Sequence, residues 1–582
     1  MKLSGAHFKD YFLKLIPYLL FICIGIILFS SAGRDDAYIT YWPAHTLSQT
    51  GQILNYNGDF VEQSSSLLHV LILAFWEKCT GFGPLLTGRI FSMLFGLLTL
   101  LALSAFSRKI DASVSWLSVL LTATSVFFIY WSFGGMETTL VACCTLLMLI
   151  GMGEYLHAPD MKLSGLILPA IYILLYILAR PENMFIAAAG LGALTVLFLV
   201  LYLIRKENNF LDIVKRTIHL AGITIGLSAA VVIFRKIYFK SIFPQPVLAK
   251  LSPGRHLLSG RTLESYIHYF EKTISTDWSI TVLSVITTIC VIVVMFKIIK
   301  KSRVDGFTAL LPAFLLANVA FIFFSTGDWM EGGRFFVHIL PLALICIPVT
   351  LHYLKVSGKL FVVILCLFMI LQGRSIYAFA KEKSLSLPLW EERSLPEPYG
   401  CTARSWWETR NLVHLRDLPL SYHLQRTVAR CWKLKQDTVI LFTGQMGMAA
   451  LHVAQTFPGQ IRFMDHFALT ERSFTECPKT RGLSRGRTGL RLKYEYFLNL
   501  VQHPEFGCMF KKPDIIYDVE KPGRIESVLR NGYTLVFRQT GSAACLPSWH
   551  SEPAGAFIAV KNELFTSFPD QKLYTFDFHL VH

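Results

Sequence analysis

Two adjacent carboxylates, Asp35 and Asp36, directly follow the first long apolar run of the chain, at residues 13–32. An ionised Asp costs about 2.5–3.5 kcal/mol at the centre of a bilayer, so we expect this pair where the first helix emerges into water. A carboxylate pair at that place could act as a general base, a metal ligand or a cation site. It could also serve only as a polar end to the helix, and position alone does not decide.

The residues around this pair favour chemistry. RDDAYITY at 34–41 and LNYNGDFVE at 54–62 resemble the first extracytoplasmic loop of polytopic glycosyltransferases of the C superfamily. The nearest resemblance is to the terminal arabinofuranosyltransferases of the mycobacterial wall and their bacterial relatives. That family typically reads DDAYI, a short helix, N-x-G-E and then VEG-x-TSPLW, and Asp59 stands here in place of its Glu.

The chain departs from the family pattern at several positions of this loop. Gln63, Leu67 and His69 replace the usual Gly, Pro and Trp. Trp42 and Pro43 replace the usual Arg and Tyr. Most of the departures lie in the second half of the loop, which the resemblance assigns to the acceptor side.

The resemblance implies an inverting transfer in which Asp35 and Asp36 are the catalytic residues. A base must take the proton from the acceptor hydroxyl as it attacks the anomeric carbon. One carboxylate is enough for this, and its neighbour could orient it or share a proton or cation with it. By analogy with the family we expect Asp35 to be the base. Many family members need no metal, and a divalent cation (Mg or Mn) at this pair stays an open alternative.

A basic segment, FRKIYFKSIFPQPVLAK at 234–250, follows a later apolar run. Lysines could clamp a lipid phosphate there as point charges, and Lys250 matches the last Lys of a comparable family pattern. We therefore predict that Lys240 and Lys250 contact the donor phosphate. The alternative is that the cations only reach toward lipid head groups, which would suit Arg235 and Lys236.

Three shorter motifs also resemble loops of the family. GDWMEGGRFF at 327–336 matches a GDWM-x-x-x-RF motif, which implies a wall of the active site that touches donor sugar or phosphate. LARPEN at 178–183 and GGMET at 134–138 match further turns. Each motif could instead hold only a structural ion pair. The predicted substrate-binding residues are Glu62, Glu137, Arg180, Glu182, Lys240, Lys250, Asp328 and Arg334.

The elements that must position these residues are membrane helices. The chain has 582 residues, of which 53% are hydrophobic and 16% charged, with a mean hydropathy of +0.48, and a helix needs about 20 apolar residues to cross a bilayer. We predict about eleven spans and take the shorter run at 66–76 as an interfacial or re-entrant helix. The predicted spans are 13–32, 84–107, 113–131, 137–156, 163–179, 183–204, 217–237, 279–299, 307–325, 335–354 and 359–379.

Charge distribution tests this count independently. With the N-terminus in the cytoplasm, every cytoplasmic turn is basic, as the positive-inside rule requires. The net charge of +16 therefore reflects topology, and no nucleic-acid partner is expected. All the motifs above, and everything after about residue 380, then lie on the opposite side. We read the N-terminal run as a retained first helix and not a signal peptide.

The composition becomes polar after about residue 380. Alternating apolar runs at 438–443, 461–464, 513–518 and 533–537 predict short strands with helices between them, hence a small α/β domain. The expected domains are a transmembrane catalytic module at 1–379, which contains the first extracytoplasmic loop at 33–83, and a soluble α/β domain at 380–582. The twelve cysteines show no metal-ligand spacing, although extracytoplasmic ones could form one or two disulfides.

These observations predict a polytopic α-helical membrane protein of glycosyltransferase-C type with a C-terminal extracytoplasmic α/β domain. The resemblance implies a polyprenyl-phosphate sugar donor and a glycan, glycolipid or protein acceptor, at the periplasmic face of a bacterial inner membrane. Membrane lipid is the other expected partner. A lipid-linked sugar transporter or flippase is the alternative, but it would bury charges near the midplane and repeat its halves. A phosphoethanolamine transferase would need a clustered metal site, which the C-terminal histidines do not suggest.

Overall fold

A computed structural model describes most of the chain. The described residues are 5–29, 36–158, 162–250, 264, 267–268, 270–271, 278–300, 306–325, 333–382, 412–444, 446–465, 469–470, 472, 512–519, 523–541 and 555–578. The chain divides into two compact units. The first unit comprises Met1–Phe29, Arg89–Ile233 and His256–Lys381, and the second comprises Ser30–Gly88, Phe234–Arg255 and Glu382–His582.

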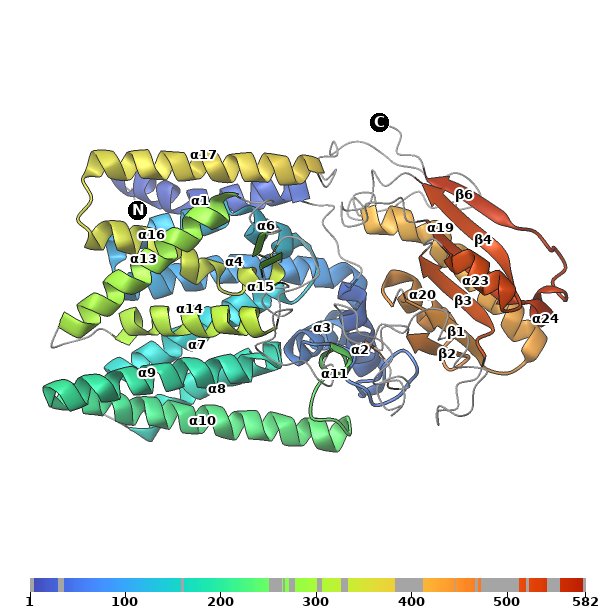
Figure 1. The fold of residues 1–582 in the computed structure, drawn as a ribbon, viewed down its shortest axis with the longest axis horizontal. Coiled ribbons are helices and arrows are strands. Elements are labelled where there is room, and N and C mark those ends of the chain that lie inside the picture. The colour runs from blue at the N-terminus through green and yellow to red at the C-terminus, as the bar shows by residue number, and fades with distance from the viewer. Residues whose placement is uncertain are drawn as a thin grey trace. The chain divides into compact units, whose positions relative to one another are not determined.

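The first unit is built of helices, most of them long and apolar (Figure 1). Helices α4 and α10 begin or end in the second unit. The helices are α1 (Gly5–Phe29), α4 (Pro84–Ile110), α5 (Ala112–Ala123), α6 (Val126–Phe133), α7 (Thr138–His157), α8 (Ile167–Ala179), α9 (Asn183–Arg205), α10 (Asn208–Tyr238), α13 (Trp278–Lys300), α14 (Gly306–Phe324), α15 (Arg334–Val337), α16 (Leu340–Tyr353) and α17 (Gly358–Glu382), with a 3₁₀ turn at Leu163–Leu166.

Seven of the described helices are long and apolar enough to cross a membrane, or eight if the bent pair α5 and α6 forms one span. Three further apolar helices are shorter, Leu13–Phe29, Ser164–Ala179 and Leu340–Tyr353. The predicted multi-pass membrane protein is thus confirmed. The count of about eleven spans stays a prediction.

The bend of 62° between α5 and α6 shows how this unit satisfies its broken backbone. A break in a membrane helix frees carbonyl groups that must find other partners. The buried Gln372 of α17 donates from Nε2 to the Leu121 carbonyl at 2.9 Å and accepts from the Thr124 hydroxyl at 2.7 Å. One amide side chain therefore compensates for the break.

The second unit combines a helical hairpin with an α/β sheet. The hairpin is α2 (Ala37–Thr50) and α3 (Leu67–Thr80), and the short helix α11 (Gln245–Lys250) belongs to the same unit. The predicted apolar run at 66–76 thus forms the helix α3, with Ser66 as its N-cap.

The six strands lie in the order β2-β1-β3-β5-β4-β6. Strand β1 pairs in parallel with β2 and β3, β5 is antiparallel to β3 and β4, and β6 is parallel to β4. The four predicted strands are all present, so the predicted α/β domain is confirmed. The strands are β1 (Val439–Thr443), β2 (Ile461–Asp465), β3 (Ile515–Val519), β4 (Tyr533–Gly541), β5 (Ala556–Lys561) and β6 (Tyr574–Phe578). The accompanying helices are α19 (Leu412–Lys435), α20 (Met448–Thr456), α23 (Arg524–Arg530) and α24 (Asn562–Phe565).

Candidate active site

Asp36 lies at the N-terminus of α2, as its N-cap residue, with φ −60° and ψ −20°. The unsatisfied N–H groups at a helix N-terminus stabilise negative charge, which favours an ionised carboxylate at this position. Asp35 lies outside the described residues. The predicted catalytic pair is therefore placed through Asp36 alone, at the start of a helix whose residues are mostly buried.

The loop after α2 folds back on that helix and is held there by side chains. Trp42 donates from its indole N–H to the Asn55 carbonyl at 2.7 Å and stacks on Tyr56 with ring centroids 5.6 Å apart. Gln63 accepts from the Tyr56 N–H at 3.1 Å and donates to the Ile39 carbonyl at 2.7 Å. Trp42 and Gln63 are two of the departures from the family pattern, so the substituted residues fix the loop to α2.

Gly58 makes the turn at the tip of this loop. Its φ of +77° lies in the left-handed region that glycine adopts without strain. The Asn55 side chain stabilises the turn by accepting from the N–H groups of Asn57 and Asp59 at 3.0 and 2.7 Å. Asp59 itself is exposed and faces Arg462 of β2 at 3.7 Å.

Glu62 is buried and forms an ion pair with a residue that we had not predicted for the site. Both of its carboxylate oxygens accept from Arg235 at the end of α10, at 2.8 and 3.1 Å. Arg235 is completely buried, so it does not reach toward lipid head groups as the alternative for this segment suggested. Burial raises the pKa of Glu62, and the Arg235 guanidinium opposes that rise. Glu62 as a substrate contact stays a prediction.

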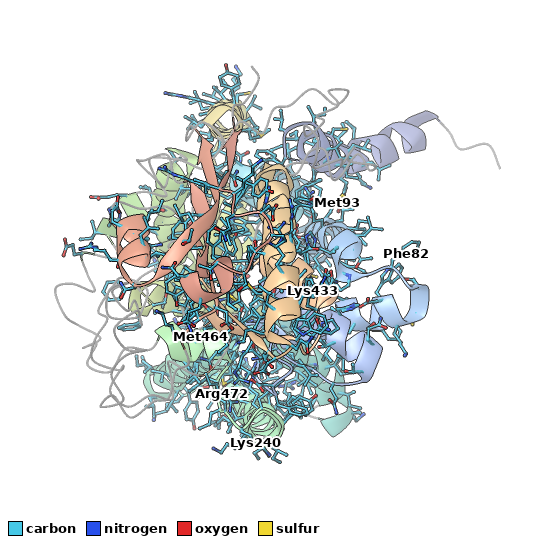
Figure 2. The ribbon with its side chains drawn as sticks, turned by 90° about the vertical axis from the view of Figure 1, so that its right-hand side faces the viewer. Phe82, Met93, Lys240, Lys433, Met464 and Arg472 are labelled. Carbon is cyan, nitrogen blue, oxygen red and sulfur yellow. The ribbon has the colours of Figure 1, made fainter. Side chains whose placement is uncertain are left out.

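The segment after α10 belongs to the same unit as this loop. The Gln245 N–H donates to the Glu62 carbonyl at 2.9 Å, and the Tyr238 hydroxyl accepts from the Ile53 N–H at 2.8 Å. Lys240 is exposed, with its ammonium group 2.9 Å from the Ile237 carbonyl. Figure 2 labels both Lys240 and Arg472. The Arg472 guanidinium donates to the carbonyl of Phe239, the residue before Lys240. Lys250 is the last residue of α11.

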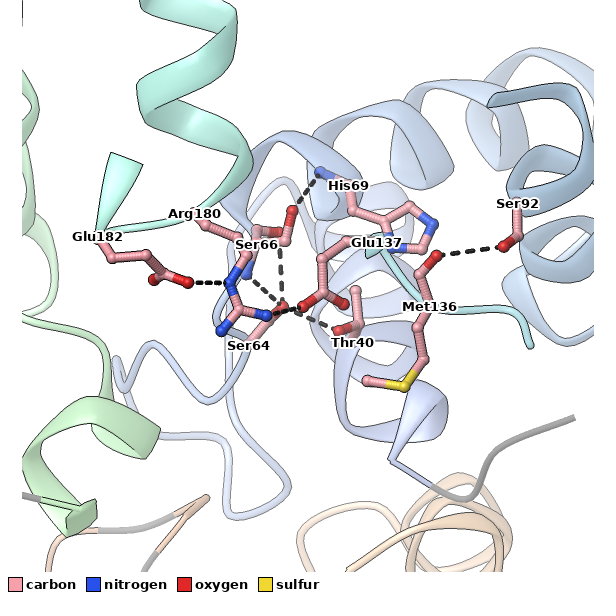
Figure 3. A network of polar contacts seen from close by, with 9 residues as sticks. All are labelled: Thr40, Ser64, Ser66, His69, Ser92, Met136, Glu137, Arg180 and Glu182. Carbon is pink, nitrogen blue, oxygen red and sulfur yellow. Dashed lines mark hydrogen bonds and ion pairs between the residues drawn. The ribbon is translucent and has the colours of Figure 1, made fainter. Parts of the chain in front are cut away.

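The first unit holds a second group of predicted residues, built around Arg180 (Figure 3). Arg180 follows the last residue of α8, and Glu137 and Glu182 are the N-cap residues of α7 and α9. Arg180 donates from Nη1 to Glu137 at 2.6 Å and from Nε to Glu182. The structure thus brings these three predicted residues together in one buried cluster, as an ion pair shared between two carboxylates.

Arg334 and the neighbouring His338 lie beside this cluster. The guanidinium groups of Arg180 and Arg334 lie 5.3 and 5.4 Å from the ring centroid of Phe335. His338 is buried, and its Nε2 has no hydrogen-bond partner among the described residues. Asp328 lies outside the described residues.

Sequence reasoning missed Arg235 and His338. Arg235 was recognised only as a surface cation, because its partner is 173 positions away. His338 follows a motif that matched the family but is not part of it. No group of three or more His, Cys, Asp or Glu side chains that could hold a metal ion occurs among the described residues.

The sequence matches no model of a known protein family and no curated protein. Its structure resembles several solved structures, among them the following at 10–12% identity. ArnT from Cupriavidus metallidurans in the apo state has a TM-score of 0.52 over 97% of this chain and 100% of that chain, at 12% identity. The Archaeoglobus fulgidus oligosaccharyltransferase in complex with Zn and sulfate has a TM-score of 0.51 over 87% of this chain and 67% of that chain, at 11% identity.

The Archaeoglobus fulgidus oligosaccharyltransferase AglB, in complex with an inhibitory peptide and a dolichol-phosphate, has a TM-score of 0.50 at 10% identity. That match covers 88% of this chain and 70% of that chain. The similarity extends over the helical unit and the C-terminal sheet rather than over one motif. The chain therefore shares the fold of these ArnT and oligosaccharyltransferase structures.

Proposed function

We propose that this chain is a membrane glycosyltransferase that moves a sugar from a polyprenyl-phosphate donor to a glycan, glycolipid or protein acceptor outside the cytoplasm. The observation that carries the proposal is the position of Asp36 at the N-terminus of α2 in a chain with this fold. A related fold that binds a dolichol-phosphate supports a lipid-phosphate donor. We further propose a catalytic module at 1–379 and a periplasmic domain at 380–582, in a bacterial inner membrane.

The proposed reaction is a single inverting displacement. Asp35, or Asp36 in its place, takes the proton from the acceptor hydroxyl, whose oxygen forms a bond to the anomeric carbon. The bond between that carbon and the phosphate oxygen breaks, and the lipid phosphate leaves with its electron pair. Lys240 and Lys250 are proposed to hold the phosphate, because an ammonium group acts there as a mobile point charge. Lys240 is exposed and free to do so except for its contact with a backbone carbonyl.

The Arg180 cluster is proposed to face the donor sugar. Glu137 and Glu182 share one guanidinium. Each carboxylate oxygen has two lone pairs and can accept from a sugar hydroxyl group as well, and the guanidinium can donate to one. Arg334 and Asp328 are proposed to contact the donor sugar or phosphate from the same side as this cluster, with the Arg334 guanidinium over the ring of Phe335.

The proposal is tested with the full chain in detergent and a panel of synthetic polyprenyl-phosphate sugars. The wild type is compared with Asp35→Asn and Asp36→Asn, and Glu563→Gln on the exposed surface of the sheet domain is the matched control. We expect one donor to be consumed and one Asn change to lower turnover at least about a hundredfold while donor binding persists. Donor binding without turnover of any panel member would instead support a flippase.

A further inference from the structure

The first loop of the second unit is attached directly to the edge of the C-terminal sheet. Strand β2 is the outermost strand at one end of the sheet, so one side of its backbone has no neighbouring strand within the described sheet. The side chain of Asn57 fills that place at Phe463. Its Nδ2 donates to the Phe463 carbonyl at 3.0 Å, and its Oδ1 accepts from the Phe463 N–H at 2.6 Å. We call these two hydrogen bonds the Asn57 clamp.

The chemistry of the clamp explains why asparagine stands at this position. A carboxamide carries one acceptor and one donor at the spacing of a peptide group, so it can pair with an edge strand as a further strand would. Exposed strand edges are otherwise sites of unwanted pairing, and covering one costs a protein little. Neither a carboxylate nor a hydroxyl of similar size offers both groups in this geometry.

Further contacts surround the clamp. Asn55 donates from Nδ2 to the Thr470 carbonyl at 2.9 Å. The loop at Thr470 is itself fixed, because the buried Asp465 at the end of β2 accepts from the N–H groups of Leu469 and Thr470 at 2.8 and 2.9 Å. The ring of Tyr56, between the two asparagines, packs on Phe463 at 5.5 Å. The sheet therefore holds the loop at three successive residues.

The clamp is continuous with the helix that begins at Asp36. Tyr56 donates from its hydroxyl to the Tyr38 carbonyl in the first turn of α2, at 3.1 Å, and stacks on Trp42 of the same helix. A displacement of the loop from β2 would therefore be transmitted to the first turn of α2, which presents Asp36.

The sheet also holds the segment that leads to Lys250. Ala249 of α11 belongs to a buried apolar cluster with Ile440, Phe442 and Met464 of strands β1 and β2. Strand β2 therefore contacts the loop that follows the carboxylate pair and also contributes to the apolar cluster that includes the helix ending at Lys250. Effects on catalysis depend steeply on such placement, since an error of about 1 Å can cost about a hundredfold in rate.

We propose that the C-terminal sheet is the scaffold that positions the catalytic loop, and that Asn57 is the positioning residue through which it does so. The inference rests on the proposed glycosyl transfer and deepens it. Because Asn57 touches neither donor nor acceptor in this proposal, its loss should lower kcat and leave the donor KM nearly unchanged.

The test compares Asn57→Ala and Asn57→Asp with the wild type in the full chain, with Asn562→Ala as matched control. Asn562 also makes a side-chain hydrogen bond in the sheet domain, to the exposed Thr534, but lies on other elements than β2. Amide hydrogen exchange is measured on peptides that cover residues 52–60, together with kcat and donor KM. For both Asn57 variants we expect exchange at least about tenfold faster in these peptides and kcat about ten- to hundredfold lower, with KM within about twofold.

Asn57→Asp keeps the acceptor for the Phe463 N–H but sets a carboxylate oxygen against the Phe463 carbonyl, and it serves as the second variant if Asn57→Ala does not fold. Unchanged exchange in both variants would overturn the clamp. Faster exchange with unchanged kcat would overturn its role in the reaction. A wild type that consumes no donor would overturn the proposed function itself, and the exchange result would still decide whether the sheet holds the loop.

Discussion

Arg180 in the first unit and Arg235 in the second are both buried and both paired with glutamate, but they differ in how their charge is balanced. Arg180 is shared by two carboxylates, Glu137 and Glu182. Arg235 has Glu62 as its ion-pair partner, in a two-point contact, and its Nη1 has no hydrogen-bond partner among the described residues. Arg180 thus bonds two carboxylates, whereas Arg235 bonds one.

The difference suggests different roles: the Arg180 cluster can bind a ligand, whereas the Glu62–Arg235 ion pair fixes the position of a loop. Glu137 and Glu182 are the N-cap residues of helices α7 and α9, whose N-termini help to stabilise their negative charge. Arg180 donates to one oxygen of each of these carboxylates. In contrast, both oxygens of Glu62 are used by Arg235, which ties the first loop to the end of α10. We therefore expect changes at Arg235 to act mainly on stability and changes at Arg180 on both stability and donor binding.

The largest effect is expected from Glu62→Ala, which leaves the Arg235 guanidinium buried without its counter-ion. Arginine does not lose its proton in proteins, so the charge cannot be removed. We expect a loss of about 3–5 kcal/mol in the free energy of unfolding. The midpoint of thermal unfolding of the full chain in detergent measures it.

The double variant Glu62→Leu with Arg235→Met is the control for this experiment. Replacement of a buried ion pair by apolar side chains of similar volume is often nearly neutral. A double variant as unstable as Glu62→Ala would show that the ion pair itself, rather than the stranded charge, sets the stability.

A smaller loss, about 2–4 kcal/mol, is expected from Arg180→Met. The change leaves Glu137 and Glu182 without their guanidinium partner, and the helix N-termini at which they lie offset only part of that loss. The unfolding midpoints of the variant and the wild type in detergent at pH 7.5 check this, and equal midpoints would contradict it.

Glu182→Gln should cost less again, about 1–3 kcal/mol, because Arg180 keeps Glu137 and the amide oxygen still accepts a hydrogen bond. The same change replaces a carboxylate oxygen of the cluster by an amide N–H, which cannot accept from a sugar hydroxyl. We expect the donor KM to rise at least about fivefold. Glu154→Gln, at an exposed ion pair with Lys109 in the same unit, is the control and should leave KM unchanged.

The elements of this molecule could be predicted from local sequence, but their long-range contacts could not. Apolar runs of about 20 residues predicted the long helices, and alternation at 438–443 and 461–464 predicted β1 and β2 within a residue or two. Periodicity reports which face of an element is apolar. It carries no information on which loop covers the edge of β2, and the Asn57 clamp joins residues 406 positions apart.

Residues of the site were predicted where they belong to a motif and missed where their role depends on a distant partner. Trp42 and Gln63 differed from the family pattern, yet they bind backbone groups 13 and 24 positions away and fix the loop. Arg235 looked like a cation at the end of a helix, and only the fold shows that Glu62 neutralises it. The type of a side chain gives its chemistry, whereas its partner is set by packing.

A third buried group, His423 of α19, differs from the two arginines because its side chain can lose its charge. Its ring stacks on Phe537 at 4.3 Å and lies near Tyr574, while Arg426 and Arg430 are close in space. Burial, followed by these two arginines, lowers the pKa of His423 from 6.5 to about 4. Unlike Arg180 and Arg235, this side chain can remain neutral at pH 7.

The pH dependence of unfolding tests whether His423 is neutral in the folded chain. Of the effects predicted here, this one should be the smallest. Between pH 6.5 and pH 4 the unfolded chain binds a proton at His423 and the folded chain does not, so stability falls as the pH is lowered through this window. We expect His423 to contribute about 1–2 kcal/mol of that fall. His423→Phe keeps an aromatic ring against Phe537 but cannot titrate, so its unfolding midpoint should decline less than that of the wild type between these two pH values. Parallel declines would mean that His423 is protonated in the folded chain, and that the neighbouring arginines do not keep it neutral.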